Sequence, residues 1–373
     1  MIALIWIDWY PYHHARLRAL TRHPHIGAGV AGIEMVGKTG VHKGLMFREA
    51  AEPELPVHTL LPASNWSLFT QVRLGFAVWR KLTGMNPRTV FVPGYYTLPG
   101  FAAAIWARVH RRKTVLMTES TQQDHRRSEW KESVKSFIIR RLFDYAIAGG
   151  KPHVRYLLAL GFSEQRIRLN YDVVDNEFFS EAATACRQSG VHGHLPSFLY
   201  VGRLAAEKNL TGLIGSYALY RMAGGSWPLV IVGSGPLEQE LKTQAAHSGF
   251  GDDIRFEGMR SSRQLPEYYA SAGCFVLPSV REPWGLVVNE AMASGLPVIV
   301  STRCGCAEDL VEEGANGFVF DPAVRGQLTE RMLTIDSLPT QDREAMGRRS
   351  SEIVSRYSPD GWAEQVLQIS SDA

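Results

Sequence analysis

The sequence of 373 residues lacks several features that mark common protein classes. No apolar stretch approaches the ~20 residues that cross a bilayer, so we expect no membrane-spanning segment. The few cysteines do not form a disulfide framework or a zinc-site pattern, although the pair Cys304 and Cys306 leaves a redox role open. The first residues have no basic leader and Asp8 interrupts their apolar run, so we expect a cytoplasmic protein.

Acidic residues are scarce in the first half of the chain. The net charge is only +3, but Met1–Asp175 holds 24 Lys and Arg against 13 Asp and Glu, which gives +11, whereas the remainder holds 16 against 24, which gives −8. This division predicts that the first half meets an anionic partner, either a phospholipid surface or a phosphate-bearing acceptor. Mutual attraction between two domains is the alternative. We expect no nucleic-acid partner, because the basic residues are scattered and no binding motif accompanies them.

The sequence does contain the pattern of an α/β protein. Apolar residues make up 45% of the chain, and its length suits two domains. Near-continuous apolar runs alternate with helical stretches, which predicts parallel sheets covered on both faces. The expected strands lie at 2–7, 89–94, 114–120 and 145–150 in the first half, and at 197–204, 228–235, 253–258, 274–279 and 297–301 in the second.

Two Rossmann-like domains follow from this pattern. The segment Val174–Ser197 shows no clear periodicity and contains Gly, His and Pro, so we expect it to be a linker. The first domain would then be residues 1–174 and the second residues 175–355. Ligands are expected in a cleft that the two sheets face.

The segment Ser279–Ser301 places two glutamates around the start of a helix. A strand ends before this loop, and apolar spacing predicts a helix from about Gly285. The backbone N–H groups of its first turn favour a phosphate, whereas Glu282 and Glu290 suit hydroxyl groups on either side of it. The alternatives are a glutamate that favours the helix dipole and a solvated helix residue.

A second loop between a strand and a helix carries two cations. The strand ends at Gly202, a helix begins near Asn209, and Arg203 and Lys208 lie between them. An Arg fork and a Lys point charge together could hold a diphosphate leaving group, although such residues are often solvated. Gly235 follows a later strand and permits close backbone approach, but the missing third glycine excludes a dinucleotide fingerprint.

Taken together, these segments resemble the retaining glycosyltransferases of family four. The resemblance covers about Phe198–Pro322. It implies the GT-B fold, in which two Rossmann-like domains face each other, with a last helix within 356–373 that returns to the first domain. The matching segments read "VGRLAAEKN", "VIVGSGPL", "YYASAGCFVLPS", "REPWGLVVNEAMASGLPVIVS" and "GANGFVFDP".

The resemblance also implies roles for single residues. Arg203 and Lys208 would bind the diphosphate of a nucleotide sugar, and Glu282 would contact hydroxyls of the transferred sugar. Glu290 would hold the ribose. The backbone at Gly285, Leu286 and Val287 would help to hold sugar and phosphate, and Met259 would lie near the base.

The first half departs from the family pattern at the acceptor side. Many relatives carry a glycine pair after the first strand, where this chain has Tyr12, His13 and His14. Many also carry a His-Asp dipeptide, where this chain has Glu119 and Ser120. Acceptor-side roles therefore do not transfer by residue. The local candidates for orienting the acceptor are His13, Glu119, Asp124, His125 and Arg127.

The implied reaction moves a sugar from a UDP- or GDP-sugar to an acceptor hydroxyl with retention. A sugar, lipid or metabolite would be the acceptor, in bacterial glycoconjugate, polysaccharide or glycosylated-metabolite biosynthesis. No bound cofactor and no metal is expected, because Arg203 and Lys208 would carry the charge and no Asp-x-Asp motif occurs. The alternatives are an epimerase or phosphorylase of the same fold, a non-catalytic sensor of nucleotide sugars, and a nicotinamide dehydrogenase.

One helical stretch in the basic half is amphipathic. Residues 130–143 carry four basic residues beside Trp130, Val134, Phe137 and Ile138. The sequence leaves two interpretations open: packing of this stripe on its own sheet, which we favour, and binding at the inner face of the plasma membrane.

Overall fold

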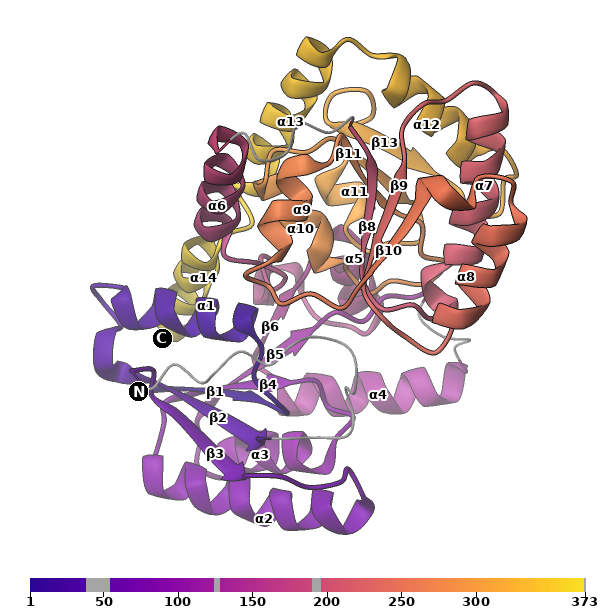
Figure 1. The fold of residues 1–373 in the computed structure, drawn as a ribbon. Helices are drawn as coiled ribbons and strands as arrows, with labels where there is room; N and C mark the ends of the chain where they lie inside the picture. Colours follow the sequence, from indigo (N-terminus) through magenta and orange to yellow (C-terminus); the bar gives the residue numbers. More distant parts are fainter. Residues whose placement is uncertain (38–53, 124–127, 190–195, 372–373) are drawn as a thin grey trace. The chain divides into compact units, whose positions relative to one another are not determined.

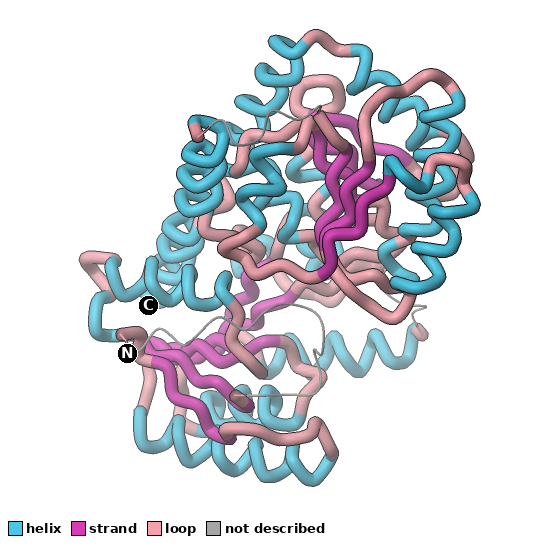
Figure 2. The backbone as a smooth tube through the Cα atoms, in the orientation of Figure 1, coloured by secondary structure: helices cyan, strands magenta, loops and turns pink. Residues whose placement is uncertain are grey.

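The computed structural model describes residues 1–37, 54–123, 128–189 and 196–371. The chain divides into two compact units (Figure 1). The first contains Met1–Val173 together with Ser358–Ala373, and the second contains Val174–Tyr357. Each unit is built around one parallel sheet with helices beside it (Figure 2).

The first unit has a seven-stranded parallel sheet in the order β3-β2-β1-β4-β5-β6-β7. Chain order reverses between β1 and β4, so loops that leave these neighbouring strands diverge at their carboxyl ends. The strands are β1 (Ile2–Trp6), β2 (Val30–Val36), β3 (Val57–Leu61), β4 (Thr89–Pro93), β5 (Lys113–Thr118), β6 (Tyr145–Ala148) and β7 (Ile167–Arg168).

The helices of the first unit include one from the far end of the sequence. Helix α14 (Pro359–Ser371) packs beside α1 (Pro11–Arg22), and its Trp362 is fully buried at 6.5 Å from the Trp6 ring. Lys113 at the start of β5 donates to the carbonyl of Ile369 at 2.7 Å. The remaining α-helices are α2 (Leu68–Met85), α3 (Leu98–Val109), α4 (Glu129–Leu142) and α5 (Lys151–Ala159).

The second unit has a six-stranded parallel sheet in the order β10-β9-β8-β11-β12-β13. Its strands are short, and the four inner ones are wholly buried, as their continuous apolar runs predict, whereas the edge strands β10 and β13 are partly exposed. They are β8 (Phe198–Val201), β9 (Leu229–Val232), β10 (Ile254–Gly258), β11 (Cys274–Leu277), β12 (Val298–Ser301) and β13 (Gly317–Phe320).

Helices surround this second sheet. They are α6 (Asn176–Gln188), α7 (Leu210–Met222), α8 (Glu238–His247), α9 (Leu265–Ser271), α10 (Leu286–Ala293), α11 (Ala307–Leu310), α12 (Gln327–Ser337) and α13 (Thr340–Val354). Helix α6 corrects the expected linker, because most of Val174–Ser197 is helical. The Asp175 side chain caps α6 by accepting from the backbone N–H of Phe178 at 3.1 Å, and Phe179 and Ala183 are buried one turn apart.

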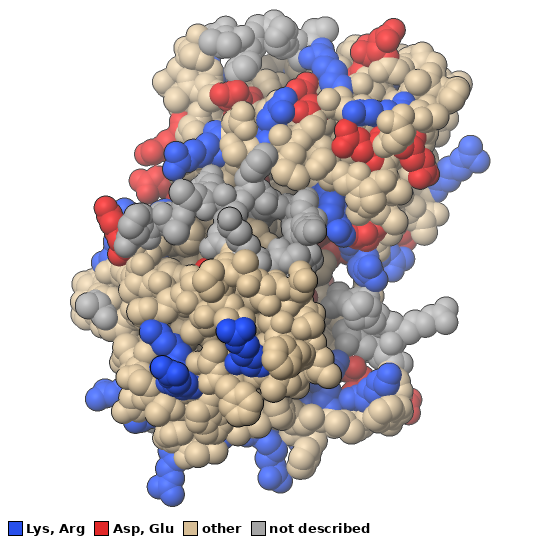
Figure 3. Space-filling view, turned by 60° about the horizontal axis from the view of Figure 1, so that its bottom comes forward, with Lys and Arg blue, Asp and Glu red and all other residues tan. Residues whose placement is uncertain are grey.

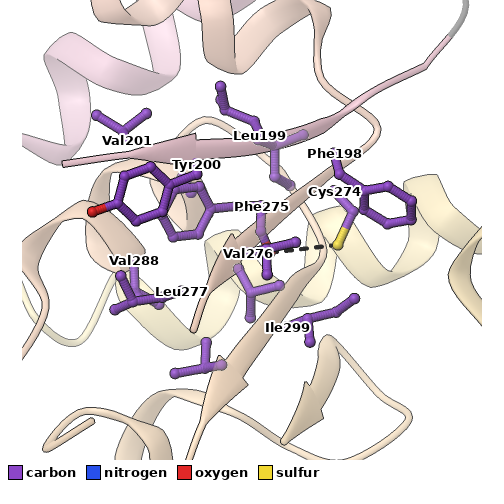
Figure 4. Packing of buried hydrophobic residues seen from close by; sticks show 14 of the residues in the cluster. Phe198, Leu199, Tyr200, Val201, Cys274, Phe275, Val276, Leu277, Val288 and Ile299 are labelled. Carbon is purple, nitrogen blue, oxygen red and sulfur yellow. Dashed lines mark hydrogen bonds between the residues drawn. The ribbon is translucent and has the colours of Figure 1, made fainter. Parts of the chain in front are cut away.

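The hydrophobic core of the second unit holds strands β8 and β11 in place. Side chains from β8 and β11 interleave with Val288 of α10 and Ile299 of β12 (Figure 4). Tyr200, Phe275 and Leu277 are at most 1% exposed, so both strands are held rigidly from their sides. The loops that leave β8 and β11 therefore start from fixed positions.

Candidate active site in the second unit

The point where chain order reverses in the second sheet lies between β8 and β11. These strands are direct neighbours, with Cys274 beside Phe198 and Phe275 beside Leu199. The chain continues from β8 to β9 on one side and from β11 to β12 on the other, so the loops diverge at the carboxyl ends of β8 and β11, where open α/β sheets bind ligands. The loop after β8 carries Arg203 and Lys208, and the loop after β11 carries Glu282.

Lys208 and Glu282, one from each of these loops, are in contact although 74 residues separate them. The Lys208 ammonium donates to the Glu282 carboxylate, and the same oxygen accepts from the Ser279 hydroxyl at 3.1 Å. Their side chains are 17% and 11% exposed. The pair is therefore largely shielded yet open to a ligand, and hydroxyl or phosphate groups of a ligand would compete for both charges.

Arg203 is held by Glu207 within the same loop. The Arg203 guanidinium forms an ion pair with Glu207, and its Nε is buried with no hydrogen-bond partner among the described residues. Partial burial opposes ionisation of Glu207, but its own backbone N–H and then Arg203 hold the pKa of this carboxyl below its ordinary value. The carbonyl of Glu207 also accepts from the Val280 N–H at 2.9 Å, so the two loops are joined by backbone.

Glu290 is not a solvated helix residue. It lies in α10 with only 4% exposure, and its carboxylate accepts from the buried Tyr269 hydroxyl of α9 at 2.7 Å. Burial raises the pKa of Glu290 to about 7, although the Tyr269 hydrogen bond lowers it. A buried carboxyl with one protein donor is suited to accept a second hydrogen bond from a ligand hydroxyl.

The start of α10 requires a glycine. Gly285 has φ 107°, and a Cβ there would approach the Leu277 side chain to 2.8 Å. Leu286 and Val287 form the first turn, whose N–H groups have no partners within the helix. Beside them, the Trp284 indole donates to Asn289 at 2.8 Å and fixes the loop against the helix.

Gly235 and Met259 lie at neighbouring strand ends. A Cβ on Gly235 would collide with the Leu204 backbone, so this glycine lets the loop after β9 approach the loop after β8. The N–H of Leu204 donates to the carbonyl of Ser234 at 3.0 Å. Met259 follows β10, the edge strand next to β9, and is partly exposed.

Glu119 lies at the carboxyl end of β5 in the first unit and belongs to a buried charged cluster. Asp172 is fully buried, and burial followed by the neighbouring Glu119 raises the pKa of the Asp172 carboxyl well above its ordinary value. Arg16 is 1% exposed and lies 4.0 Å from Asp172, with its guanidinium 4.6 Å from the centre of the Tyr171 ring. Asp124, His125 and Arg127 lie outside the described residues.

His13 has a structural contact that the sequence did not suggest. Its Nδ1 accepts from the Tyr10 backbone N–H at 3.1 Å, and its ring stacks on Trp6 at 4.5 Å. The side chain is 6% exposed. The contact with Tyr10 caps helix α1, so the His13 ring has a structural role at the start of this helix.

Sequence patterns did not identify four other residues around these sites. Glu207 lies in the same loop as Arg203, and Ser279 lies in the same loop as Glu282. Their closeness in sequence to these predicted residues could therefore have identified them. Tyr269 and Asp172 had no such signal, because their partners are distant in sequence. Within the described ranges, no three His, Cys, Asp or Glu side chains gather as a metal site would require.

Parts of this chain are similar to known proteins. The family described as "Glycosyl transferases group 1" matches residues 184–352. Sulfoquinovosyl transferase SQD2 from Arabidopsis thaliana is 30% identical over 245 residues, which are 63% of this chain and 45% of SQD2. Alpha-D-kanosaminyltransferase from Streptomyces kanamyceticus is 28% identical over 216 residues, which are 56% of this chain and 54% of that protein. The chain thus spans about half the length of the curated relatives it matches.

Solved structures extend the similarity to both units. The structure of Anabaena HepE in complex with UDP and glucose matches this chain with a TM-score of 0.76 at 18% identity. The match covers 100% of this chain and 99% of the HepE chain. Sucrose-phosphate synthase from Thermosynechococcus elongatus has a TM-score of 0.75 at 20% identity, and the match covers 99% of this chain and 97% of the synthase chain. The GT-B fold with two Rossmann-like units is thereby confirmed.

Proposed function

We propose that this chain transfers a sugar from a nucleoside diphosphate sugar to an acceptor hydroxyl, because residues 184–352 match the model of the group 1 glycosyl transferases. The donor would be a UDP- or GDP-sugar, and the anomeric configuration would be retained. One observation carries the proposal: Lys208 and Glu282 meet where chain order reverses between β8 and β11, with Arg203 on the same loop as Lys208.

The proposed chemistry depends on charge that develops on the leaving diphosphate. Lys208 and Arg203 would stabilise that charge, and the N–H groups of Leu286 and Val287 would add the dipole of a helix start. The acceptor hydroxyl would attack the anomeric carbon on the face from which the diphosphate leaves, so no side chain need act as a nucleophile. An oxygen of the departing diphosphate would take the acceptor proton. Because these two cations would neutralise the charge of the diphosphate, no metal ion would be required.

The two glutamates would position the groups on either side of the diphosphate. Glu282 would exchange its bond to Lys208 for hydroxyls of the transferred sugar, and Glu290 would accept from the ribose. Met259 would lie beside the base, and Gly235 would keep the loop after β9 close to the phosphates. On the acceptor side, Glu119 remains a candidate for holding the acceptor hydroxyl.

A thermal-shift screen tests the proposal most directly. Ligands that bind the folded form raise the melting temperature, and we expect UDP or GDP and one of their sugars to do so. ADP and the free sugars serve as controls. The proposal would be wrong if none of the nucleotides shifted the transition. Incubation of the binding donor without acceptor, followed by sugar analysis, separates transfer from epimerisation.

Glu290→Ala is expected to weaken binding of the nucleoside diphosphate by roughly 10- to 100-fold, the loss of one hydrogen bond to a charged acceptor. Calorimetric titration measures this change. Pyrophosphate, which has no ribose, should bind the variant and the wild type equally well. A parallel loss for both ligands would contradict the assignment. Tyr269→Phe is the control, because it removes the protein donor and leaves the carboxyl in place.

The pKa of Glu290 predicts a pH-dependent stability. A carboxyl whose pKa is raised from 4.5 to about 7 binds more protons when folded than when unfolded between these values. The free energy of unfolding should therefore fall as the pH rises from 4.5 to 7, by about 3 kcal/mol in total. Urea denaturation of wild type and Glu290→Gln across this range checks the sign. If the difference in the free energy of unfolding between the wild type and Glu290→Gln did not change with pH from 4.5 to 7, the raised pKa of Glu290 would be wrong.

A further inference from the structure

Helix α2 has an outward face that no part of the described chain covers. Its buried side repeats every four residues through Thr70, Leu74, Val78 and Leu82. Large apolar side chains lie on the remaining surface, and four of them are exposed by 45% to 77%: Leu68, Phe69, Val72 and Phe76. Arg73 and Arg80 are exposed too, and helical spacing places them on the same side as Phe69 and Phe76.

Helix α4 repeats this arrangement and corrects the favoured interpretation of residues 130–143. Trp130, Val134 and Phe137 are 66%, 49% and 55% exposed, so this stripe does not pack on its own sheet. Ile139 alone among the α4 residues is buried. The Arg141 guanidinium lies 5.0 Å from the Phe137 ring centre, which keeps a cation beside the exposed apolar stripe.

The two helices cover one face of the first sheet. The chain passes from β3 through β4 and β5 to β6, and after β3 each strand lies further in one direction along the sheet. Right-handed crossovers between parallel strands therefore place α2, α3 and α4 on the same side. Helices α2 and α3 are in direct contact along this side (Figure 1). We call the outward surfaces of α2 and α4 the α2–α4 face.

Basic residues predominate on the α2–α4 face, where Glu129 at the start of α4 is an exposed acidic residue. From Leu55 to Thr118 there is no Asp or Glu, and the Lys and Arg residues number eight. Figure 3 turns the side that carries α2 toward the viewer, and Lys and Arg stand there among uncharged residues, with acidic residues only toward the margins. On α4, Glu132 is engaged by Lys135 at 2.8 Å and by the Tyr156 hydroxyl at 2.6 Å.

We propose that the α2–α4 face docks on the surface of an anionic lipid bilayer. Exposed Phe and Trp side chains beside Arg and Lys match the two parts of such a surface, the acyl boundary and the anionic headgroups. A second copy of this chain would bring two faces of the same positive sign together, which is unfavourable. No described helix is long and apolar enough to cross the bilayer, so the contact would be peripheral.

Vesicle sedimentation with the full chain tests the proposal. We expect binding to phosphatidylcholine vesicles that contain phosphatidylglycerol, little binding to phosphatidylcholine alone, and release as salt rises from about 50 to 500 mM. Arg73→Gln with Arg80→Gln should lower the partition coefficient about 30-fold, at ~1 kcal/mol for each cation. Phe69→Ser with Phe76→Ser should lower it at least ~10-fold.

The second unit offers matched controls. Met222 of α7 is 74% exposed, so Met222→Ser removes a comparable apolar side chain elsewhere. Arg325 and Arg348 are also exposed, so Arg325→Gln with Arg348→Gln removes the same charge. These variants should bind vesicles as the wild type does, and all variants should melt alike because every changed side chain is exposed.

Three results would overturn the proposal. One is no sedimentation with anionic vesicles at low salt, and another is equal binding to neutral vesicles. The third is wild-type binding by both α2 double variants. Ultracentrifugation without lipid adds a separate outcome: a dimer that the Phe69→Ser, Phe76→Ser variant dissociates would assign the α2–α4 face to a second copy. Donor binding in the thermal-shift screen is independent of these outcomes.

Discussion

Lys208→Ala is expected to lower turnover by roughly 100- to 1000-fold, the cost of removing one fixed group that stabilises charge in a transition state. The structure explains why a single lysine can have this effect. Glu282 and the loop after β8 hold its ammonium where strands β8 and β11 diverge, so the charge needs no reorganisation when the diphosphate departs. Release of nucleoside diphosphate from the donor found by thermal shift measures the rate.

A matched lysine variant gives the control for this experiment. Lys242 on α8 also pairs with a glutamate, Glu238 at 2.8 Å, but its side chain is 45% exposed and lies on a helix surface. Lys242→Ala should leave turnover unchanged. The proposed role would be refuted by a Lys208→Ala enzyme whose turnover is within about threefold of the wild type, since no charge-stabilising donor would then have been lost.

Glu282→Ala is expected to lower kcat/KM for the nucleotide sugar by about 100-fold, because a hydrogen bond from a sugar hydroxyl to a carboxylate is lost. Binding of the nucleoside diphosphate should change by less than about threefold, because this ligand lacks the transferred sugar whose hydroxyls would donate to Glu282. Calorimetry with both ligands, beside steady-state kinetics, separates the two effects.

The removal of Glu282 also frees Lys208, and this complication can be controlled. Ser279→Ala removes the second donor to the Glu282 carboxylate, at 3.1 Å, without removing charge. We expect only a small effect from that change. If Glu282→Ala weakened both ligands equally, the glutamate would act on the diphosphate through Lys208 and not on the sugar.

The sequence predicted the second unit better than the first for a physical reason. Strands β8, β9, β11 and β12 are buried on both faces, so their apolar runs are visible without knowledge of their neighbours. Strand β2 was missed because Glu34 interrupts its run. The Glu34 carboxylate is buried but accepts from the Trp9 N–H at 3.2 Å and the Thr59 hydroxyl at 2.6 Å, and such distant compensation leaves no local pattern.

The same distinction applies to the candidate site. Arg203, Lys208 and Glu282 were predictable because each follows a strand end, where parallel sheets bind ligands. The burial of Glu290 was not predictable from helical spacing. Its surroundings in α10 are buried from Val288 to Ala293, and its donor, Tyr269, comes from another helix. On the acceptor side, the contact of Glu119 with Asp172 likewise depends on how β5 and the segment after β7 meet.

The return of α14 to the first unit has a consequence for the order in which the protein matures on the ribosome. Domains generally fold as units during synthesis. The second unit is one continuous segment, Val174–Tyr357, and can close as soon as it has emerged. The first unit must wait, because Trp362 can pack near Trp6 only after the whole second unit has been translated. The first unit is therefore synthesised first but completed last, and until α14 is added the apolar residues that pack against Trp362 would be accessible to chaperones.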